Sequence, residues 1–297
     1  MSMPASPRPG RADVGSSASS APDRLQADCA RCFGLCCVAP GFSASADFAI
    51  DKPAGQPCPN LRPDFRCGIH ERLRARGFRG CAGYDCFGAG QWVSQVTFGG
   101  QDWRQAADSG PAMFEVFAIM RQLHELLWYL SQALGAPAAR PLHGDLQAAL
   151  GATERLTHRP AGVLTGMDLR GHRGDVSHLL RRASELMRAS VPGPKPDHAG
   201  ADLVGARLTG SNLAGANLRG ACLIGADLRN ADLRAADFTG ADMRDADVSG
   251  ADLTGSLFLT RAQLDAATGD PATKLPRGLA RPAHWPGLAV PRRADAP

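Results

Sequence analysis

Residues 201–260 divide without interruption into twelve groups of five: ADLVG, ARLTG, SNLAG, ANLRG, ACLIG, ADLRN, ADLRA, ADFTG, ADMRD, ADVSG, ADLTG and SLFLT. The first place of every group is Ala or Ser, and the third place is Leu, Phe, Met or Val. Five residues rotate an α-helix by one turn plus about 140°, so the large side chains would scatter around it. A strand alternates its faces at every residue, so an odd period would send every second Leu into solvent. Neither regular element can bury this pattern.

A fixed short period is typical of a solenoid. We expect each group of five to form one straight side of a coil, with its small first residue and large third residue pointing inward. Gly, which fills many of the fifth places, suits a tight corner because it tolerates positive φ. Stacked coils would then pair their backbone groups along the axis.

With these residues the chain resembles the pentapeptide-repeat family, whose motif is A(D/N)LXX. The resemblance implies a right-handed quadrilateral β-helix with four groups per coil, and therefore about three coils over residues 201–260. At ~4.8 Å between neighbouring coils this β-helix would be roughly 15 Å tall.

Length and composition set the frame for the rest of the chain. A chain of 297 residues, 44% of them hydrophobic, predicts more than one domain with an ample core. No apolar run approaches the ~18 residues of a membrane span, and the N-terminus lacks the apolar stretch of a secretory signal. We therefore expect a cytoplasmic protein without a membrane partner. The net charge of +4 is small and diffuse, which disfavours nucleic acid as a partner.

Eight of the nine cysteines lie between residues 29 and 86, which favours bound metal over disulfides in a chain without an export signal. The predicted ligands are Cys29, Cys32, Cys36, Cys37, Cys58, Cys67, Cys81 and Cys86. A C-x-x-C pair can chelate one tetrahedral ion. The adjacent Cys36 and Cys37 point apart, which leaves two metal sites, a cluster or a spare thiol as alternatives. His70 is either one more ligand or a capping or core histidine.

Four pieces of this region resemble the zinc- or iron-chelating CxxCxxCC family, also called the YkgJ-type cysteine cluster. They are Cys29-Ala-Arg-Cys32 with Cys36-Cys37, then Cys58-Pro-Asn-Leu61, then Cys67-Gly-Ile-His70-Glu71-Arg72, and then Cys81. One extra residue precedes the vicinal pair, so the pattern does not decide which of its two thiols would ligate. The resemblance implies zinc or an iron–sulfur cluster as the cofactor and leaves the choice between them open.

These signals predict six segments: a disordered tail (1–27), a metal-stapled Cys-rich domain (28–111), a helical region (112–191), a linker (192–200), the repeat (201–260) and a C-terminal cap and tail (261–297). Helical spacing predicts helices from about residue 112 to 134, from 143 to 156 and from near 175 to 191. A capping helix is expected over 261–267, since an open solenoid end exposes pairing edges. Leu275, Leu279 and Trp285 would either pack along a face of the coil or form a homodimer.

Two further features of the sequence have ordinary interpretations. Arg72, Arg74, Arg76 and Arg79 form a basic run that we interpret as a solvated helix face rather than a phosphate site. Isolated Cys222 is interpreted as a plain surface thiol.

The favoured function is a non-enzymatic metal-binding protein whose β-helix offers a face to another protein, since no catalytic constellation appears. One alternative is an iron–sulfur or metal-dependent modifying enzyme, by analogy with a flagellin lysine methylase that carries a similar cysteine set. Another is a redox sensor built on the vicinal thiols. A DNA-mimic topoisomerase inhibitor ranks last, because the repeat carries eight Asp against five Arg and is shorter than one turn of DNA, ~34 Å.

Overall fold

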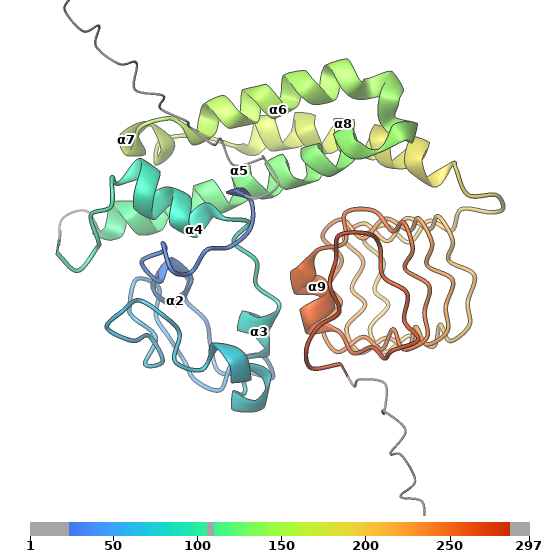
Figure 1. Ribbon diagram of the computed structural model, residues 1–297, viewed down its shortest axis with the longest axis horizontal. Helices are drawn as coiled ribbons and strands as arrows, with labels where there is room; N and C mark the ends of the chain where they lie inside the picture. The colour runs from blue at the N-terminus through green and yellow to red at the C-terminus, as the bar shows by residue number, and fades with distance from the viewer. Residues whose placement is uncertain (1–23, 106–109, 286–297) are drawn as a thin grey trace, which may run out of the picture.

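The computed structural model describes residues 24–105 and 110–285, so the predicted tail of residues 1–27 lies mostly outside the described residues. Figure 1 shows three parts: a cysteine region of short helices and loops, a layer of long helices, and a coil that hangs beneath that layer. The helix α5 (Gly110–Gly135) runs along the layer above both other parts.

The helical layer consists of α5, α6 (His143–Thr157) and α8 (Arg170–Arg188). The first two agree with their predicted spans, whereas α8 begins five residues before the predicted Asp175. The short helices are α2 (Leu35–Val38), α3 (Arg79–Ala82), α4 (Ala89–Trp92), α7 (Ala161–Leu164) and α9 (Arg261–Ala266). The remaining turns are 3-10 helices at His70–Arg72, Arg74–Arg76 and Pro137–Leu142, and a π-helix at Val93–Thr97.

The two halves of α5 pack against different parts of the molecule. Met113 and Phe117 in its first half belong to the core shared with Leu35 and Val38 of the cysteine region. Its second half, from Leu126 onward, packs with α6, α8 and the end of the coil. The apolar side chains of α5 are therefore core residues along its length, and α5 joins the cysteine region to the coil.

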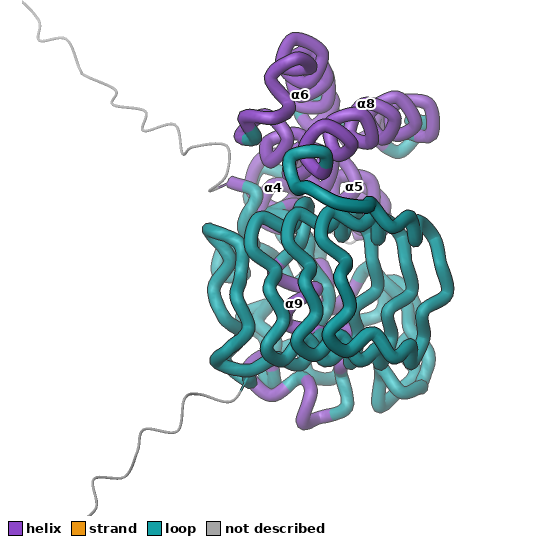
Figure 2. The backbone as a smooth tube through the Cα atoms, turned by 90° about the vertical axis from the view of Figure 1, so that its right-hand side faces the viewer, coloured by secondary structure: helices purple, strands orange, loops and turns teal. Residues whose placement is uncertain are grey.

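The coil repeats every twenty residues. From Asp197 to Asp237, each second-place residue makes a parallel bridge to the residue twenty positions later, as Asp202 does to Cys222 and Asp232 to Asp252. Third-place N–H groups donate along the axis, for example from Leu208 to the carbonyl of Asp227 at 2.8 Å. One coil therefore contains four groups of five, although these bridges are isolated ones and the described residues contain no longer strand. Figure 2 shows the stacked coils side by side.

Pairing extends beyond residues 201–260 at both ends. Asp197, inside the segment predicted as a linker, bridges to Asn217. At the other end Thr268 and Lys274 bridge to Asp247 and Asp252, after α9 has interrupted the repeat. The Thr260 side chain accepts a hydrogen bond from Gln263 N, and Gln263 Oε1 accepts one from Thr260 N, so α9 begins with a capping box.

The interior of the coil follows the sequence pattern until the last group. Third-place side chains from Leu213 to Leu253 are buried among the first-place alanines. Phe258 was expected to point inward, but this expectation is wrong: its backbone has φ +58° and its side chain packs with the helices, together with Leu257. Leu259, expected to face outward, enters the coil core instead. The last group has therefore turned its large residues toward α5.

Candidate metal centre

Short elements bring the cysteines of the front region together. The helix α2 carries Cys36 and Cys37, and the N–H of Cys58 donates to the carbonyl of Cys37 at 2.9 Å. A bridge between Leu61 and Cys67 then folds the next segment back on the first. All nine cysteines lie among the described residues, and none of them forms a disulfide there.

Three of the predicted ligands lie close enough to affect one another's protonation. The Cys37 thiol lies within hydrogen-bonding reach of the thiols of Cys36 and Cys67. Cys58 and Cys81 lie near enough to interact electrostatically with each other, and Cys81 also with Cys36 and Cys67. These five thiols form what we call the thiol cluster: Cys36, Cys37, Cys58, Cys67 and Cys81.

The other three predicted ligands lie at the border of this group. Cys29 interacts electrostatically with Cys36 and Cys67. Cys32 and Cys86 lie beside each other, on either side of Gly90, where an added Cβ would come within 2.6 Å of the Cys32 sulfur and 3.9 Å of the Cys86 sulfur. Gly90 therefore leaves room for the Cys32 sulfur, and the Cys86 sulfur lies near the same point.

The environment sets the protonation of these thiols. Burial raises the pKa of Cys32 and of Cys81 to about 12 and that of Cys86 to about 11. The hydrogen bond from Cys37 lowers the pKa of Cys67 to about 6, whereas the bond to Cys36 raises the pKa of Cys37 itself. Metal binding would have to release protons from most of these sulfurs.

A lysine that sequence reasoning missed lies beside the cluster. Lys52 is only 4% exposed, and its Nζ donates to the carbonyls of Val38, Pro53 and Gln56 at 2.9–3.1 Å. Burial lowers its pKa, and the neighbouring sulfurs of Cys58 and Cys37 oppose this shift. The ammonium group can therefore balance thiolate charge, but a single Lys between loops leaves no periodic signal in a sequence.

The thiols are ligands of the chemical type that a soft metal prefers, but their positions do not form a ready-made site. Thiolates are preferred ligands of zinc and of iron–sulfur clusters. In residues 24–105 and 110–285, however, no three Cys, His, Asp or Glu side chains converge closely enough to hold an ion. Metal binding therefore requires some thiol side chains to rotate. His70 is exposed and lies close enough to Cys67 to help lower the pKa of that thiol.

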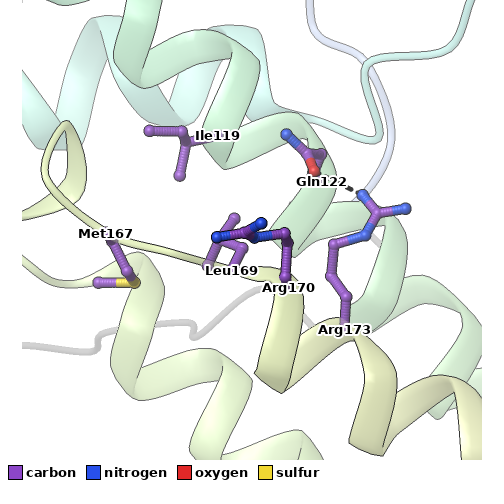
Figure 3. A pocket seen from close by; sticks show the side chains of 6 residues that line it. All are labelled: Ile119, Gln122, Met167, Leu169, Arg170 and Arg173. Carbon is purple, nitrogen blue, oxygen red and sulfur yellow. Dashed lines mark hydrogen bonds between the residues drawn. The ribbon is translucent and has the colours of Figure 1, made fainter.

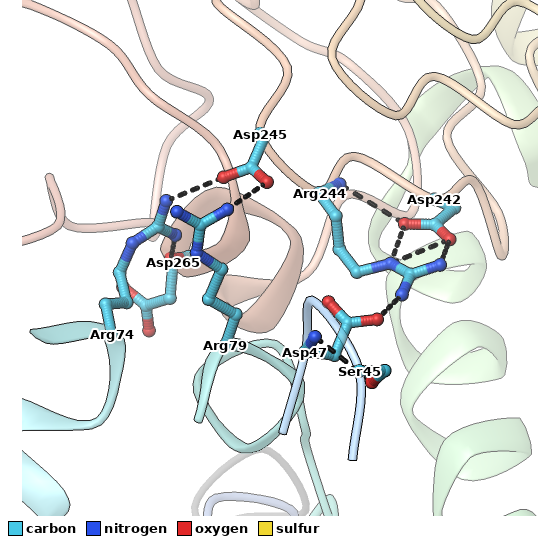
Figure 4. A network of polar contacts seen from close by, with 8 residues as sticks. All are labelled: Ser45, Asp47, Arg74, Arg79, Asp242, Arg244, Asp245 and Asp265. Carbon is cyan, nitrogen blue, oxygen red and sulfur yellow. Dashed lines mark hydrogen bonds and ion pairs between the residues drawn. The ribbon is translucent and has the colours of Figure 1, made fainter. Parts of the chain in front are cut away.

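The basic run does not form a solvated helix face, because two of its arginines bind the coil (Figure 4). The Asp245 carboxylate accepts from Arg79 Nη1 at 2.7 Å and from Arg74 Nη2 at 3.3 Å. Arg244 of the coil binds Asp47 of the cysteine region and also its own neighbour Asp242. We call these six residues and their contacts the ionic interface.

The sequence held a signal for this interface. Asp245 occupies a fifth place, where Gly stands in most groups, and its φ of +55° is one that glycine adopts easily. A non-glycine residue in this conformation points to a constraint imposed from elsewhere. Here the carboxylate holds two guanidinium groups of another part of the chain.

Two pockets lie outside the thiol cluster. A cleft of about 470 Å³ opens where the three parts meet, and its lining includes Tyr84, Asp85, Arg121 and Glu125. Burial raises the pKa of Asp85. A second pocket, of about 390 Å³, lies between α5 and the start of α8, where Arg173 donates to Gln122 at 2.6 Å (Figure 3).

Comparison with known proteins shows which family the chain belongs to. The pattern described as "Pentapeptide repeats (8 copies)" matches residues 199–230 and 221–258. The chain is 58% identical to the uncharacterized protein YybG of Bacillus subtilis (strain 168) over 264 residues, 88% of this chain and 95% of that protein. The chain belongs to the same family as YybG. It is a pentapeptide-repeat protein, as the five-residue period predicted.

A solved structure gives a weaker likeness. A pentapeptide repeat protein from the Arabidopsis thaliana thylakoid lumen is 28% identical, over 31% of this chain and 63% of that chain. The TM-score is 0.14, so we take no fold from it. The resemblance of the front region to the CxxCxxCC family stays a prediction. No helix in the described ranges has both the length and the apolar character needed to cross a bilayer.

Proposed function

We propose that this family member is a non-enzymatic metal-binding protein, in which the thiol cluster holds zinc or an iron–sulfur centre. The observation that supports it most is the interaction between the thiols of Cys37 in α2 and Cys67, which come from separate segments. Soft thiolate donors together with a nearby ammonium group, Lys52, match the chemistry of a thiolate-bound cation. A bound ion would stabilise this region, where much of the chain is loop.

We further propose that the coil is the right-handed quadrilateral β-helix of the repeat family and serves as a scaffold for another protein. The twenty-residue spacing of its parallel bridges supports this fold. On its outer sides Arg229 and Arg234 bind Asp227 and Asp232 of the same groups at 2.6–2.7 Å. Because these acidic charges are already paired, the coil offers a mixed surface suited to a protein partner rather than an acidic imitation of DNA.

A redox sensor is the second candidate, and the same thiol contact favours it. With a peroxide as oxidant, the Cys67 thiolate would attack one peroxide oxygen and become a sulfenic acid, while the other oxygen leaves as water or an alcohol. The Cys37 thiol would then displace water from the sulfenic acid and form a disulfide. This route uses a partner outside the vicinal pair.

A pair of cysteine variants tests metal binding. Cys67→Ser should weaken zinc affinity by about ten-fold or more, because it removes one thiolate from the cluster. Cys222→Ser is the matched control, since Cys222 is an equally half-buried thiol in the coil. Zinc titration of each variant against a chromogenic chelator gives the affinities. Equal zinc affinity in both variants and the parent protein would rule out the thiol cluster as the site.

A further inference from the structure

The first coil, residues 196–215, has a neighbouring coil on one side only. In the second coil the second-place N–H groups donate backward, for example from Cys222 to Ala201 and from Asp227 to Ala206, both at 2.9 Å. The equivalent N–H groups of the first coil find no acceptor within the described ranges. They belong to Asp197, Asp202, Arg207 and Asn212.

Carbonyl groups point out of the same end. Gly205 N donates to the carbonyl of Ile224 at 2.8 Å, so fourth-place carbonyls face the preceding coil. For Val204 and Thr209 that preceding coil is absent, and their carbonyls accept no hydrogen bond from any described residue. A fourth-place N–H is already used where Asp or Asn stands at the second place, as when Val204 N donates to Asp202 Oδ1 at 3.2 Å. Thr209 follows Arg207 instead, and its N–H finds no acceptor among the described residues. We call this row of second-place donors and fourth-place acceptors the open edge.

The two ends of the coil differ in their cover. At the far end α9 and Trp285 close the coil, and Trp285 is 3% exposed with its indole N–H donating to Ala267. At the open edge Leu203 and Leu208 are only partly buried, and Val204 is 57% exposed. In Figure 1 the capped end faces the cysteine region and the open edge faces away from it.

The open edge is complementary to itself. Two copies stacked end to end about a two-fold axis perpendicular to the coil axis run their sides in opposite directions. With the corners aligned, a second place of one copy faces a fourth place of the other, and third places meet at the centre. Along residues 201–210 each free second-place N–H then faces a free fourth-place carbonyl, as in an antiparallel pair.

We propose that this edge binds a second copy of the chain, so that the two coils form one continuous stack in a closed dimer. An isologous contact of this kind satisfies both partners at once. The cap at the far end prevents further stacking, so the assembly stops at two chains. Leu203 and Leu208 would become buried in the joined interior, and unpaired edges would be removed from solvent.

Arg207→Pro tests the contact with little cost to the single chain. Proline removes the N–H of residue 207, which donates to nothing within the described chain, so thermal unfolding of the monomer should change little. Two-fold symmetry doubles the loss in the dimer, and we expect its dissociation constant to rise about ten-fold or more. Arg207→Ala keeps the N–H and is the matched control, with an expected change within about two-fold.

Sedimentation velocity over a wide range of concentrations measures the dissociation constants. The parent protein should approach twice its 31.2 kDa at high concentration. Hydrogen exchange is the second measurement: the amides of Asp202 and Arg207 should become protected as the dimer forms. A monomer at every concentration, or a dimer that Arg207→Pro leaves intact, overturns the proposal. It also fails if deletion of residues 1–23, rather than dilution, deprotects these amides, since that segment would then occupy the edge.

Discussion

The coil meets its two neighbours through different chemistry. Its last group joins the helices through apolar side chains, with the Phe258 ring edge-on to Tyr129 at a centroid distance of 5.6 Å. It meets the cysteine region through the carboxylates and guanidinium groups of the ionic interface. Apolar burial is insensitive to salt, whereas partly exposed ion pairs are weak and screened. The apolar contact of Leu257 and Phe258 with the helices, which we call the apolar joint, should therefore persist at high salt. The ionic interface should weaken as salt is added.

The largest effect should come from the apolar joint. Phe258→Ala removes a side chain that is 3% exposed, and we expect a loss of about 3–5 kcal/mol in the free energy of unfolding. Phe258→Leu keeps much of the volume and should cost less. Urea unfolding at low and at high salt measures both variants. A loss that shrinks strongly with salt would contradict an apolar joint.

The joint between α5 and the cysteine region should depend on pH. His124 is 2% exposed, its Nδ1 lies 2.8 Å from the carbonyl of Phe87, and burial lowers its pKa to about 4 from the usual 6.5. Between pH 4 and pH 6.5, His124 of the unfolded chain therefore binds a proton that His124 of the folded chain does not bind. Stability should be fully present above pH 6.5 and fall by on the order of 3 kcal/mol as pH drops toward 4.

His124→Gln is the variant for this measurement, because its amide can still donate to Phe87. Thermal unfolding followed from pH 7 to 4 should show a flatter decline for the variant than for the parent protein. An identical slope in both would place the pH dependence elsewhere.

The smallest effect should come from the ionic interface. Asp245→Asn removes the charge that holds Arg74 and Arg79, with an expected loss of about 0.5–1 kcal/mol that disappears at high salt. Asp245→Gly removes the same charge, but glycine adopts a φ of +55° without steric strain, so this variant should be the more stable of the two. Urea unfolding at two salt concentrations separates them. A loss in Asp245→Asn that salt does not change would show that packing rather than charge acts here.

The sequence predicts the regular parts of the structure better than the irregular ones. The twenty-residue coil and the stripe of α5 were predictable, because a fixed period repeats the same local solution many times. Phe258 escaped prediction because its group fits the period but lies where the coil touches another part. The interactions of Cys37 with Cys67, and of Lys52 with the carbonyl of Val38, join separate segments of an irregular region. Asp245 could be noticed in the sequence, because it replaces the usual glycine of a fifth place, as Asn230 and Ala235 also do.

Elemental analysis of anaerobically purified protein, with an absorption spectrum of the same sample, tests the proposed metal centre most directly. We predict at least one zinc or iron per chain, with absorbance near ~400 nm if the metal is an iron–sulfur cluster. The Cys67→Ser variant should contain less metal than the Cys222→Ser variant. Fully folded protein with no stoichiometric metal would contradict the account.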